Sequence, residues 1–243
     1  MKHKLLLLVL VCFAVTGATA VAKDAPTITQ IDPAEIPART MMSGTTGLVG
    51  NLNPGYWRIS GWFTGAEEYK FLFNPVEQLD CPAGFQLEQV HMLLDFDDTM
   101  NYPITFEVWC DLEDAWWDNV LQCWIPGEED CRSDTYAVTI DVPGTYDIGI
   151  PITCECAYMT DPTGAPYWYM LSMHFPNLFA ANLITDDFPV PCYSWNNWGS
   201  GWVDLVATSG FPGGIVMWGD VICCSDPVAI EERSWGDIKS LFR

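Results

Sequence analysis

Residues 138–152 read Val-Thr-Ile-Asp-Val-Pro-Gly-Thr-Tyr-Asp-Ile-Gly-Ile-Pro-Ile, and this stretch decides the class of fold. Every second side chain is apolar on both sides of Pro143-Gly144, and the positions between are polar, small or proline. Alternation with a period of two is typical of strands that bury one face, and a Pro-Gly pair is typical of a tight turn. The stretch therefore predicts two half-buried antiparallel strands joined by a turn.

The same spacing recurs along most of the chain, interrupted by Gly, Pro, Asp or Asn about every ten residues and without a long helical pattern. Further strands are expected at 90–96, 104–108, 167–175 (central) and 214–222, with a hairpin of 56–62 and 68–73 and a polar loop at 111–135. The sequence thus predicts an all-β fold, a single antiparallel β-sandwich or jelly roll of about nine strands over residues 53–226.

Two flanking segments differ from this pattern. Residues 23–52 are rich in Pro, Gly, Ser and Thr, which predicts an extended lead-in with little regular structure. In the C-terminal tail, residues 227–243, Trp235, Ile238 and Leu241 fall at helical spacing. The tail is expected to be a short helix docked on the β domain, a sorting or attachment signal, or a frayed end.

Residues 1–22 have the three parts of a secretory signal peptide. Lys2 and Lys4 precede an apolar run, and the small residues Ala18, Ala20 and Ala22 follow it. The run is shorter than the ~20 residues that span a bilayer, which favours a signal peptide over an N-terminal membrane anchor. We therefore expect a protein that is secreted or displayed on the cell surface, with no membrane span.

Acidic residues dominate the charge. The 243-residue chain has 32 Asp and Glu against 10 Lys and Arg, and its formal net charge is −22 at pH 7. Nucleic acid and anionic lipid repel such a chain, so neither is expected as a partner. A hydrophobic content of 49% argues against disorder. Bound divalent cations, covalent cross-links or a salty medium are expected to offset the self-repulsion of the compact state.

The chain contains 10 cysteines, and removal of residues 1–22 takes away Cys12. In an oxidising compartment the remaining odd number forms at most four disulfides and leaves one thiol, which can link two copies. No Cys-x-x-Cys pair is present, so disulfides are expected rather than a zinc site. The pairing is open among Cys81, Cys110, Cys123, Cys131, Cys154, Cys156, Cys192, Cys223 and Cys224.

Three stretches carry a resemblance. Tyr-Trp-Arg-Ile-Ser-Gly-Trp-Phe-Thr-Gly at residues 56–65 and the aromatic segment at residues 192–206 resemble parts of uncharacterised secreted β-sandwich proteins of environmental bacteria. The end, Ser-Trp-Gly-Asp-Ile-Lys-Ser-Leu-Phe-Arg at residues 234–243, is similar to short Trp-Gly-x-Ile-Lys-type tails on exported proteins of such organisms. The resemblance implies secretion and a sandwich, and it carries no activity or functional residue.

The aromatic content is high, because 12 Trp, 9 Tyr and 12 Phe make up 14% of the chain. Aromatic faces stack on the C–H-rich faces of sugars while neighbouring amides and carboxylates bond the hydroxyls, so rings among Asn, Gly and Ser predict a carbohydrate site. The alternative is that these rings close one end of the core. The candidate ligand residues are Tyr193, Trp195, Asn196, Asn197, Trp198 and Trp202, and the pair Trp116-Trp117 is a second candidate.

Acidic clusters at loops and strand ends suit calcium, which takes roughly 6–8 oxygen ligands. Asp95, Asp97 and Asp98 are the first candidates for one structural Ca2+. The alternative is a solvated acidic surface.

Catalytic motifs are missing from the sequence, which has no Gly-x-Ser-x-Gly elbow, no His-Glu-x-x-His pair and no Gly-rich phosphate loop. His91 is expected to face solvent, opposite Val90 and Met92. A glycoside hydrolase needs two facing carboxyls, for which Glu88 and Glu107 on two strands expected to be adjacent are the candidates.

The predicted function is therefore a non-catalytic, secreted or cell-surface β-sandwich that serves as a structural or adhesive module stabilised by disulfides. The alternatives are a carbohydrate-binding module and a jelly-roll glycoside hydrolase. A glycan or a cell-surface protein is the expected partner.

Overall fold

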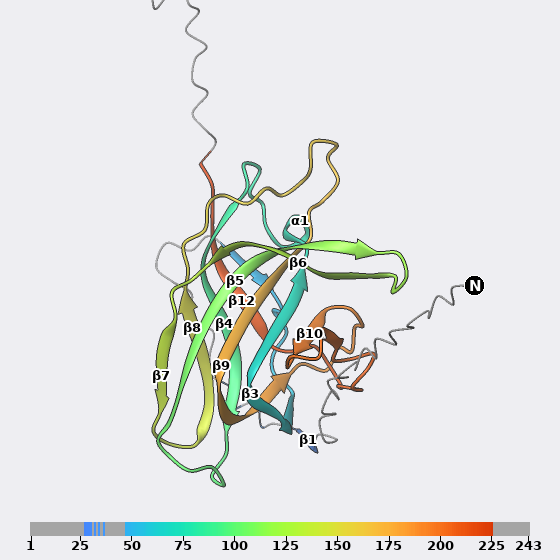
Figure 1. Cartoon of the computed structure of the whole chain (residues 1–243). Coiled ribbons are helices and arrows are strands. Elements are labelled where there is room, and N and C mark those ends of the chain that lie inside the picture. Colours follow the sequence, from blue (N-terminus) through green and yellow to red (C-terminus); the bar gives the residue numbers. More distant parts are fainter. Residues whose placement is uncertain (1–26, 31, 33, 35, 37–46, 226–243) are drawn as a thin grey trace, which may run out of the picture.

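The computed structural model describes residues 27–30, 32, 34, 36 and 47–225 (Figure 1). The predicted signal peptide, residues 1–22, and the predicted tail, residues 227–243, lie outside the described residues. Within them the chain is nearly all β, as predicted, and its one described α-helix is the four-residue α1 (Pro75–Gln78). No described helix is long and apolar enough to cross a membrane.

The strands vary from two to 17 residues. They are β1 (Thr27–Gln30), β2 (Gly47–Gly50), β3 (Trp57–Phe73), β4 (Phe85–Phe96), β5 (Ile104–Asp118), β6 (Cys123–Arg132), β7 (Tyr136–Ile140), β8 (Gly144–Pro151), β9 (Tyr169–Thr185), β10 (Ser194–Asn197), β11 (Val203–Asp204) and β12 (Met217–Cys223).

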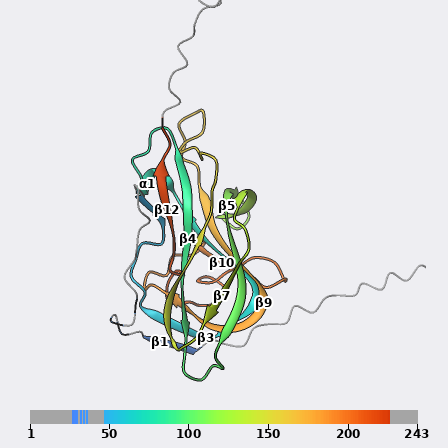
Figure 2. The same ribbon diagram turned by 90° about the vertical axis from the view of Figure 1, so that its left-hand side faces the viewer.

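These strands form one antiparallel sheet that curls on itself. Its main path is β11-β10-β3-β9-β4-β12-β2, with β8 on β4 and with β5 on β9. The long strand β9 turns the sheet, because its first half pairs with β5 and its second half pairs with β4. In a view turned by 90°, β12 and β4 lie toward one side and β5 and β9 toward the other (Figure 2).

The core is enclosed by this curl. Leu87, Met92 and Leu94 of β4 belong to the same buried cluster as Leu171 and Met173 of β9. The alternation that predicted strands is confirmed at six apolar positions that are buried, Val90, Met92, Leu94, Phe96, Ile148 and Ile150, whereas Val142 is 57% exposed.

Three segments differ from the expectation. The expected hairpin at 56–73 is one strand, β3, whose pairing with β9 shifts register around Gly61 and Gly65. The expected polar loop at 111–135 is instead a hairpin of β5 and β6, with register shifts beside Glu113. The lead-in at 23–52 contributes β1 and β2, which pair with β3 and β12. Most residues of the β5–β6 hairpin beyond Glu113 are exposed or half-buried, so they do not show the alternation of a half-buried strand. β1 and β2 have four residues each, which is too short for a clear period.

Four disulfides cross-link the domain, in agreement with the expected number. The pairs are Cys81–Cys223, Cys123–Cys192, Cys131–Cys154 and Cys156–Cys224. Two of them hold the end of β12, and Cys123–Cys192 ties the β5–β6 hairpin to the segment before β10. Cys110 is the free cysteine of the described residues.

Cys110 is expected to be inert in the folded protein. Its side chain is buried in the core, and burial raises the pKa of the thiol to about 12. The thiolate is the reactive form, so Cys110 should not be alkylated in native protein and should take up one label after denaturation without reductant. Labelling of Cys110 at the native rate of an exposed thiol would contradict its burial. The link between two copies that the odd thiol suggested is therefore not expected from the folded state.

Candidate functional site

The tryptophans of the segment 192–206 do not form a shared open platform. Trp195 is buried, with 4% of its surface exposed, and its indole donates to the Cys192 carbonyl at 2.9 Å. Trp198 packs edge-on against Trp62, and Trp202 lies under the Lys70 ammonium, 4.2 Å from the ring centroid. Trp195 therefore packs in the core, whereas Trp198 and Trp202 are half-buried and pack against the rest of the domain.

The two asparagines have different surroundings. Asn196 is fully buried, accepts from the Trp62 indole at 3.0 Å and donates to Glu67 at 3.0 Å. Asn197 is half-buried, and its side-chain oxygen accepts from the Gly199 and Gly201 amides. Asn196 is thus a structural residue, whereas Asn197 reaches a surface pocket described below.

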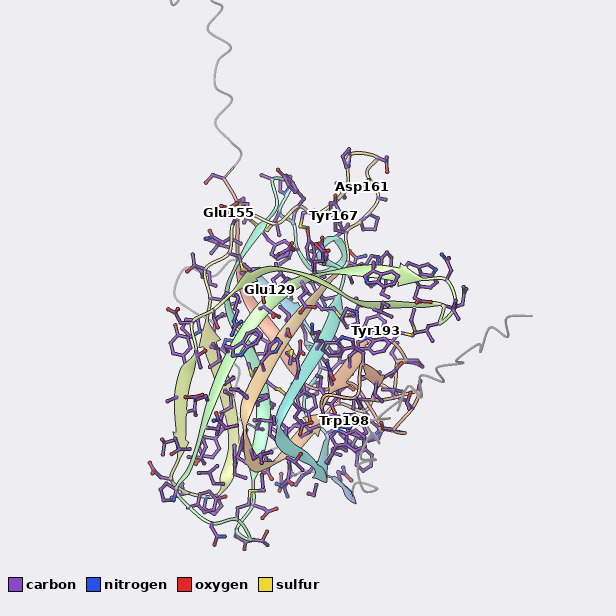
Figure 3. The ribbon with its side chains drawn as sticks, in the orientation of Figure 1. Glu129, Glu155, Asp161, Tyr167, Tyr193 and Trp198 are labelled. Carbon is purple, nitrogen blue, oxygen red and sulfur yellow. A yellow bond between two sulfur atoms is a disulfide. The ribbon has the colours of Figure 1, made fainter. Side chains whose placement is uncertain are left out.

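A different set of rings forms a continuous surface, which we call the aromatic ridge: Trp117, Trp124, Trp168 and Tyr193. Trp117 meets Trp124 edge-on at 5.7 Å, Trp124 stacks on Trp168 at 5.4 Å, and Trp168 meets Tyr193 at 6.4 Å. Trp117 is 41% exposed at the β5–β6 hairpin, which projects from the rest of the domain (Figure 1). Figure 3 shows Tyr193 below this hairpin and Trp198 farther down on the same side.

Sequence reasoning included Tyr193 and Trp117 among its candidates but missed Trp124 and Trp168. The two missed rings come from β6 and from the residue before β9, which are distant in sequence from Tyr193. The only local signal was at residues 167–175, where the side chains on both faces of the strand are apolar. Such a run indicates that a ring such as Trp168 packs outside the main core.

A charged cluster lies beside the ridge on the outer face of β3, β9 and β5. Its members alternate with core residues such as Tyr69, Leu112 and Met173, so they point away from the core. Pairing places Glu68 opposite His174 and both Lys70 and Asp111 opposite Ser172. The charged cluster consists of Glu68, Lys70, Asp111, Glu113, Ser172 and His174.

His174 is the meeting point of the cluster. Its Nε2 lies 2.8 Å from Ser172 Oγ, 3.0 Å from Asp111 Oδ2 and 3.2 Å from Glu68 Oε1. The residue types match a Ser-His-Asp triad, but that relay needs the serine on one ring nitrogen and the carboxylate on the other. Here both contact Nε2, so His174 cannot pass a proton from Ser172 toward Asp111.

Lys70 pairs with two of the acidic residues of the cluster. Its ammonium forms a close ion pair with Glu113 and lies 2.9 Å from Glu68 Oε1. Burial raises the pKa of the Glu113 carboxyl to about 8, an effect that the Lys70 charge opposes and that Asp111 reinforces. Oε2 of Glu113 and Oδ1 of Asp111 are buried without a hydrogen-bond partner.

A pocket of about 300 Å³ opens over this cluster. Glu68, Trp109, His174 and Asn197 line it, together with Gly199. Trp109 stacks on His174 with ring centroids 3.3 Å apart, and Arg132 covers its other face at 3.5 Å. The pocket thus presents a carboxylate, an imidazole and an amide to solvent.

The predicted calcium ligands lie at a second pocket, of about 380 Å³. Asp95 is buried, and the Arg58 guanidinium binds both of its oxygens at 2.8 and 2.9 Å. Asp97 is half-buried and accepts from Asn182 and Thr99, whose hydroxyl is the first cause that lowers the pKa of Asp97. Asp98 is exposed. Arg58 already supplies the positive charge that Asp95 would otherwise take from a cation.

The residues considered for hydrolysis do not come together. β4 pairs with β8, β9 and β12, whereas β5 pairs with β6, β7 and β9, so Glu88 and Glu107 are not on adjacent strands. The expectation that His91 faces solvent is wrong. His91 is 4% exposed, bonds Asp147 at 2.8 Å and stacks on Trp218, because the β4 face opposite the core is itself covered by β12 residues.

A third pocket, of about 280 Å³, is lined by Tyr158, Tyr167 and Tyr169 with Asp114, Asp130 and Glu155. Figure 3 places Tyr167 and Glu155 at the upper end of the domain, away from Trp198. Burial and the charge of Asp114 raise the pKa of Asp130 to about 6.

No protein-family model, no curated protein and no solved structure matches the chain.

Proposed function

We infer that the protein is an exported, disulfide-stabilised β domain that binds glycans, without catalysing their cleavage, through the aromatic ridge and the pocket over the charged cluster. The single observation that carries this proposal is that a row of four rings, of which Trp117 is exposed and the others are half-buried, lies on the same face as a pocket lined by Glu68, His174 and Asn197.

The chemistry of the two parts is complementary. Indole faces bind the apolar faces of sugar rings, and the ridge presents Trp117, 41% exposed, next to the half-buried Trp124 and Trp168. Carboxylate, imidazole and amide groups bond hydroxyls and set specificity.

Export and the closure of the curled sheet into a sandwich or jelly roll belong to this proposal, whereas calcium at Asp95, Asp97 and Asp98 does not, because Arg58 already pairs with Asp95. Four disulfides support export, because such bridges persist in oxidising compartments.

Two features support binding rather than catalysis. The Ser172, Asp111 and His174 contacts converge on one nitrogen and cannot relay a proton. Asp111 and Glu113 are buried, and Lys70 pairs with Glu113. A carboxyl that acts on a glycosidic bond must instead face the substrate.

The test is a glycan-array screen of the oxidised protein followed by titration with the strongest glycan. Trp117→Ala should lower affinity about tenfold or more, the loss expected when an anchoring aromatic is truncated. Trp116→Ala is the matched control, because Trp116 is the next residue, is 52% exposed and does not belong to the ridge. Equal affinity of the two variants, or a blank array with and without calcium, would contradict the proposal.

A second candidate is adhesion to a protein through the tip of the β5–β6 hairpin. Val120 is 90% exposed and Leu121 is 58% exposed there, and exposed apolar patches mark contact surfaces. This candidate would be favoured if the protein bound a cell-surface protein but no glycan. The double substitution Val120→Ser and Leu121→Ser should then abolish that binding.

A further inference from the structure

We propose that the aromatic ridge leads into a subsite that holds the terminal sugar residue of the bound glycan, and that this residue is uncharged. The subsite is a pocket of about 250 Å³, which we call the end pocket. Its lining includes Asn53, Asn74, Glu77, Phe188, Val190 and Tyr193. The end pocket adds to the proposed glycan binding and depends on it.

Tyr193 joins the end pocket to the ridge. Its ring meets Trp168, the neighbouring ring of the ridge, at 6.4 Å, and Tyr193 also lines the pocket. The same ring packs against Phe71 at 6.0 Å, and the Tyr193 carbonyl accepts from the Leu72 amide at 2.8 Å, so β3 fixes its position. A glycan that contacts Tyr193 on the ridge can therefore place its next sugar in the end pocket.

One wall of the end pocket is held by hydrogen bonds to Asp186, which is 2% exposed. Its Oδ1 accepts from the Phe188 and Gly214 amides at 3.0 and 2.7 Å. Its Oδ2 accepts from the side chains of Asn51 and Asn53 at 3.1 and 2.8 Å. This wall is ordered without a ligand, and a preformed pocket loses little conformational entropy on binding.

A second wall comes from α1. Asn74 caps this helix by accepting from the Val76 amide at 3.1 Å, and its side-chain amide donates to Glu77 Oε1 at 3.1 Å. Gln78 donates to the Gly50 carbonyl at 2.9 Å and accepts from the Gly50 amide at 2.8 Å, which fixes α1 against β2. Glu77 is exposed, so its carboxylate can accept from a sugar hydroxyl.

Apolar side chains of the pocket are open to solvent, where the face of a sugar ring can pack. Phe188 is 55% exposed and Val190 is 46% exposed. Burial and the charge of Glu77 raise the pKa of Tyr193 above its ordinary value, so its phenol stays protonated and can donate a hydrogen bond. The end pocket thus combines an aromatic face with a donor and an acceptor, the groups that bind a sugar ring.

Size and charge define the class of sugar. Pockets that hold a whole drug-sized ligand measure roughly 300–1,000 Å³. The end pocket, at about 250 Å³, is smaller and fits one sugar unit rather than several. Glu77 and Asp186 line it, and none of the described residues that line it is Lys, Arg or His. An acidic sugar would meet negative charge there without a cation, which favours an uncharged one.

The experiment is a calorimetric titration of the oxidised protein with short and long soluble chains of one sugar. The probes are chains of whichever sugar binds most tightly among cello-, xylo-, manno- and chito-oligosaccharides. Recognition of a chain end should give one bound protein per chain at every length, because each chain has one end of each kind. A terminal uronate on the same chain should lower the affinity at least about tenfold.

Phe188→Ala should lower the affinity for the short chain at least about tenfold, because it removes the exposed ring of the pocket. Tyr158→Ala is the matched control, since Tyr158 is an aromatic residue that is 71% exposed and lines a different pocket. Circular dichroism checks that both variants are folded. Unchanged affinity in folded Phe188→Ala, or several proteins bound to each long chain, would overturn the proposal.

Failure of the end pocket differs from failure of glycan binding as a whole. If Trp117→Ala weakens binding and Phe188→Ala does not, the ridge binds glycans and the end pocket has no part in it. If no chain binds and the glycan array is blank, the glycan proposal fails and the end pocket fails with it.

Discussion

Replacing Lys70 by methionine is expected to lower the free energy of unfolding by about 1 kcal/mol at pH 6 and by about 2 kcal/mol at pH 9. Lys70 is 3% exposed and pairs with Glu113, which is 4% exposed. Loss of one partner of a buried pair leaves the other charge uncompensated, and this cost exists only where Glu113 is ionised.

The pH window follows from the raised pKa of Glu113. Burial moves this pKa from 4.5 to about 8, so Glu113 adds most to stability below pH 4.5, and that contribution is lost as the pH rises through about 8. Lys70 holds the pKa down, and without it the pKa rises further. The variant therefore loses additional stability above pH 8. Below that pH the carboxyl is neutral in both proteins, and only weaker contacts of Lys70 are lost.

Urea denaturation at pH 6 and pH 9, at constant ionic strength, measures the difference. The control is the same substitution in a Glu113→Gln background, where the cost of losing Lys70 should be the same at both pH values. Glu68 also pairs with Lys70, but it is the same in both backgrounds and cancels in the comparison. An equal loss at both pH values in the Glu113 background would show that Lys70 does not compensate the Glu113 charge.

Gly65→Ala is expected to lower the free energy of unfolding by about 2–5 kcal/mol, because it adds the cost of a strained backbone to that of a steric clash. Gly65 has φ of +73°, a conformation that L side chains rarely adopt. A Cβ atom there would lie 2.1 Å from the Asn177 carbonyl oxygen and 2.7 Å from the Phe179 nitrogen. Both are backbone atoms of β9, which cannot turn aside as a flexible side chain can.

Gly61 provides the control for Gly65, since its φ is +75° and a Cβ atom there would meet nothing within 4 Å. Gly61→Ala should therefore show the backbone cost alone, about 1–2 kcal/mol. Chemical denaturation of the two variants at the same pH measures how much more stability Gly65→Ala loses than Gly61→Ala. Equal losses would mean that β9 moves away from β3 without cost, contrary to the close packing of the bend.

The alternating apolar and polar residues at 138–152 show how much of the structure a local sequence pattern predicts. Ile148 and Ile150 are buried as their alternation predicts, because the side chains of a strand point to its two faces in turn. The same rule was wrong for His91, since β12 pairs with β4 and its Trp218 covers the face that the rule assigned to solvent. Alternating residue types identify the two faces of a strand. Which of the two faces is exposed to solvent depends on how the neighbouring strands pack.

The candidate site was largely beyond prediction. Glu68, Asp111 and His174 are separated by tens of residues and meet because β9 pairs with β3 on one side and with β5 on the other. Strand register between distant segments has no local signal. Trp195 looked like a ligand residue from its polar neighbours in sequence, but pairing with Lys70 of β3 places it in a buried cluster.

The sequence by itself determined the β class, the strongly acidic charge and the number of possible disulfides, because these depend on composition and on the two-residue period of a strand. The tertiary structure alone decided which cysteines pair, which tryptophans line up as a ridge, and which charges share the outer face of β3, β9 and β5. Those features depend on contacts between residues far apart in the chain, where the curl of the sheet, rather than sequence spacing, sets the distances.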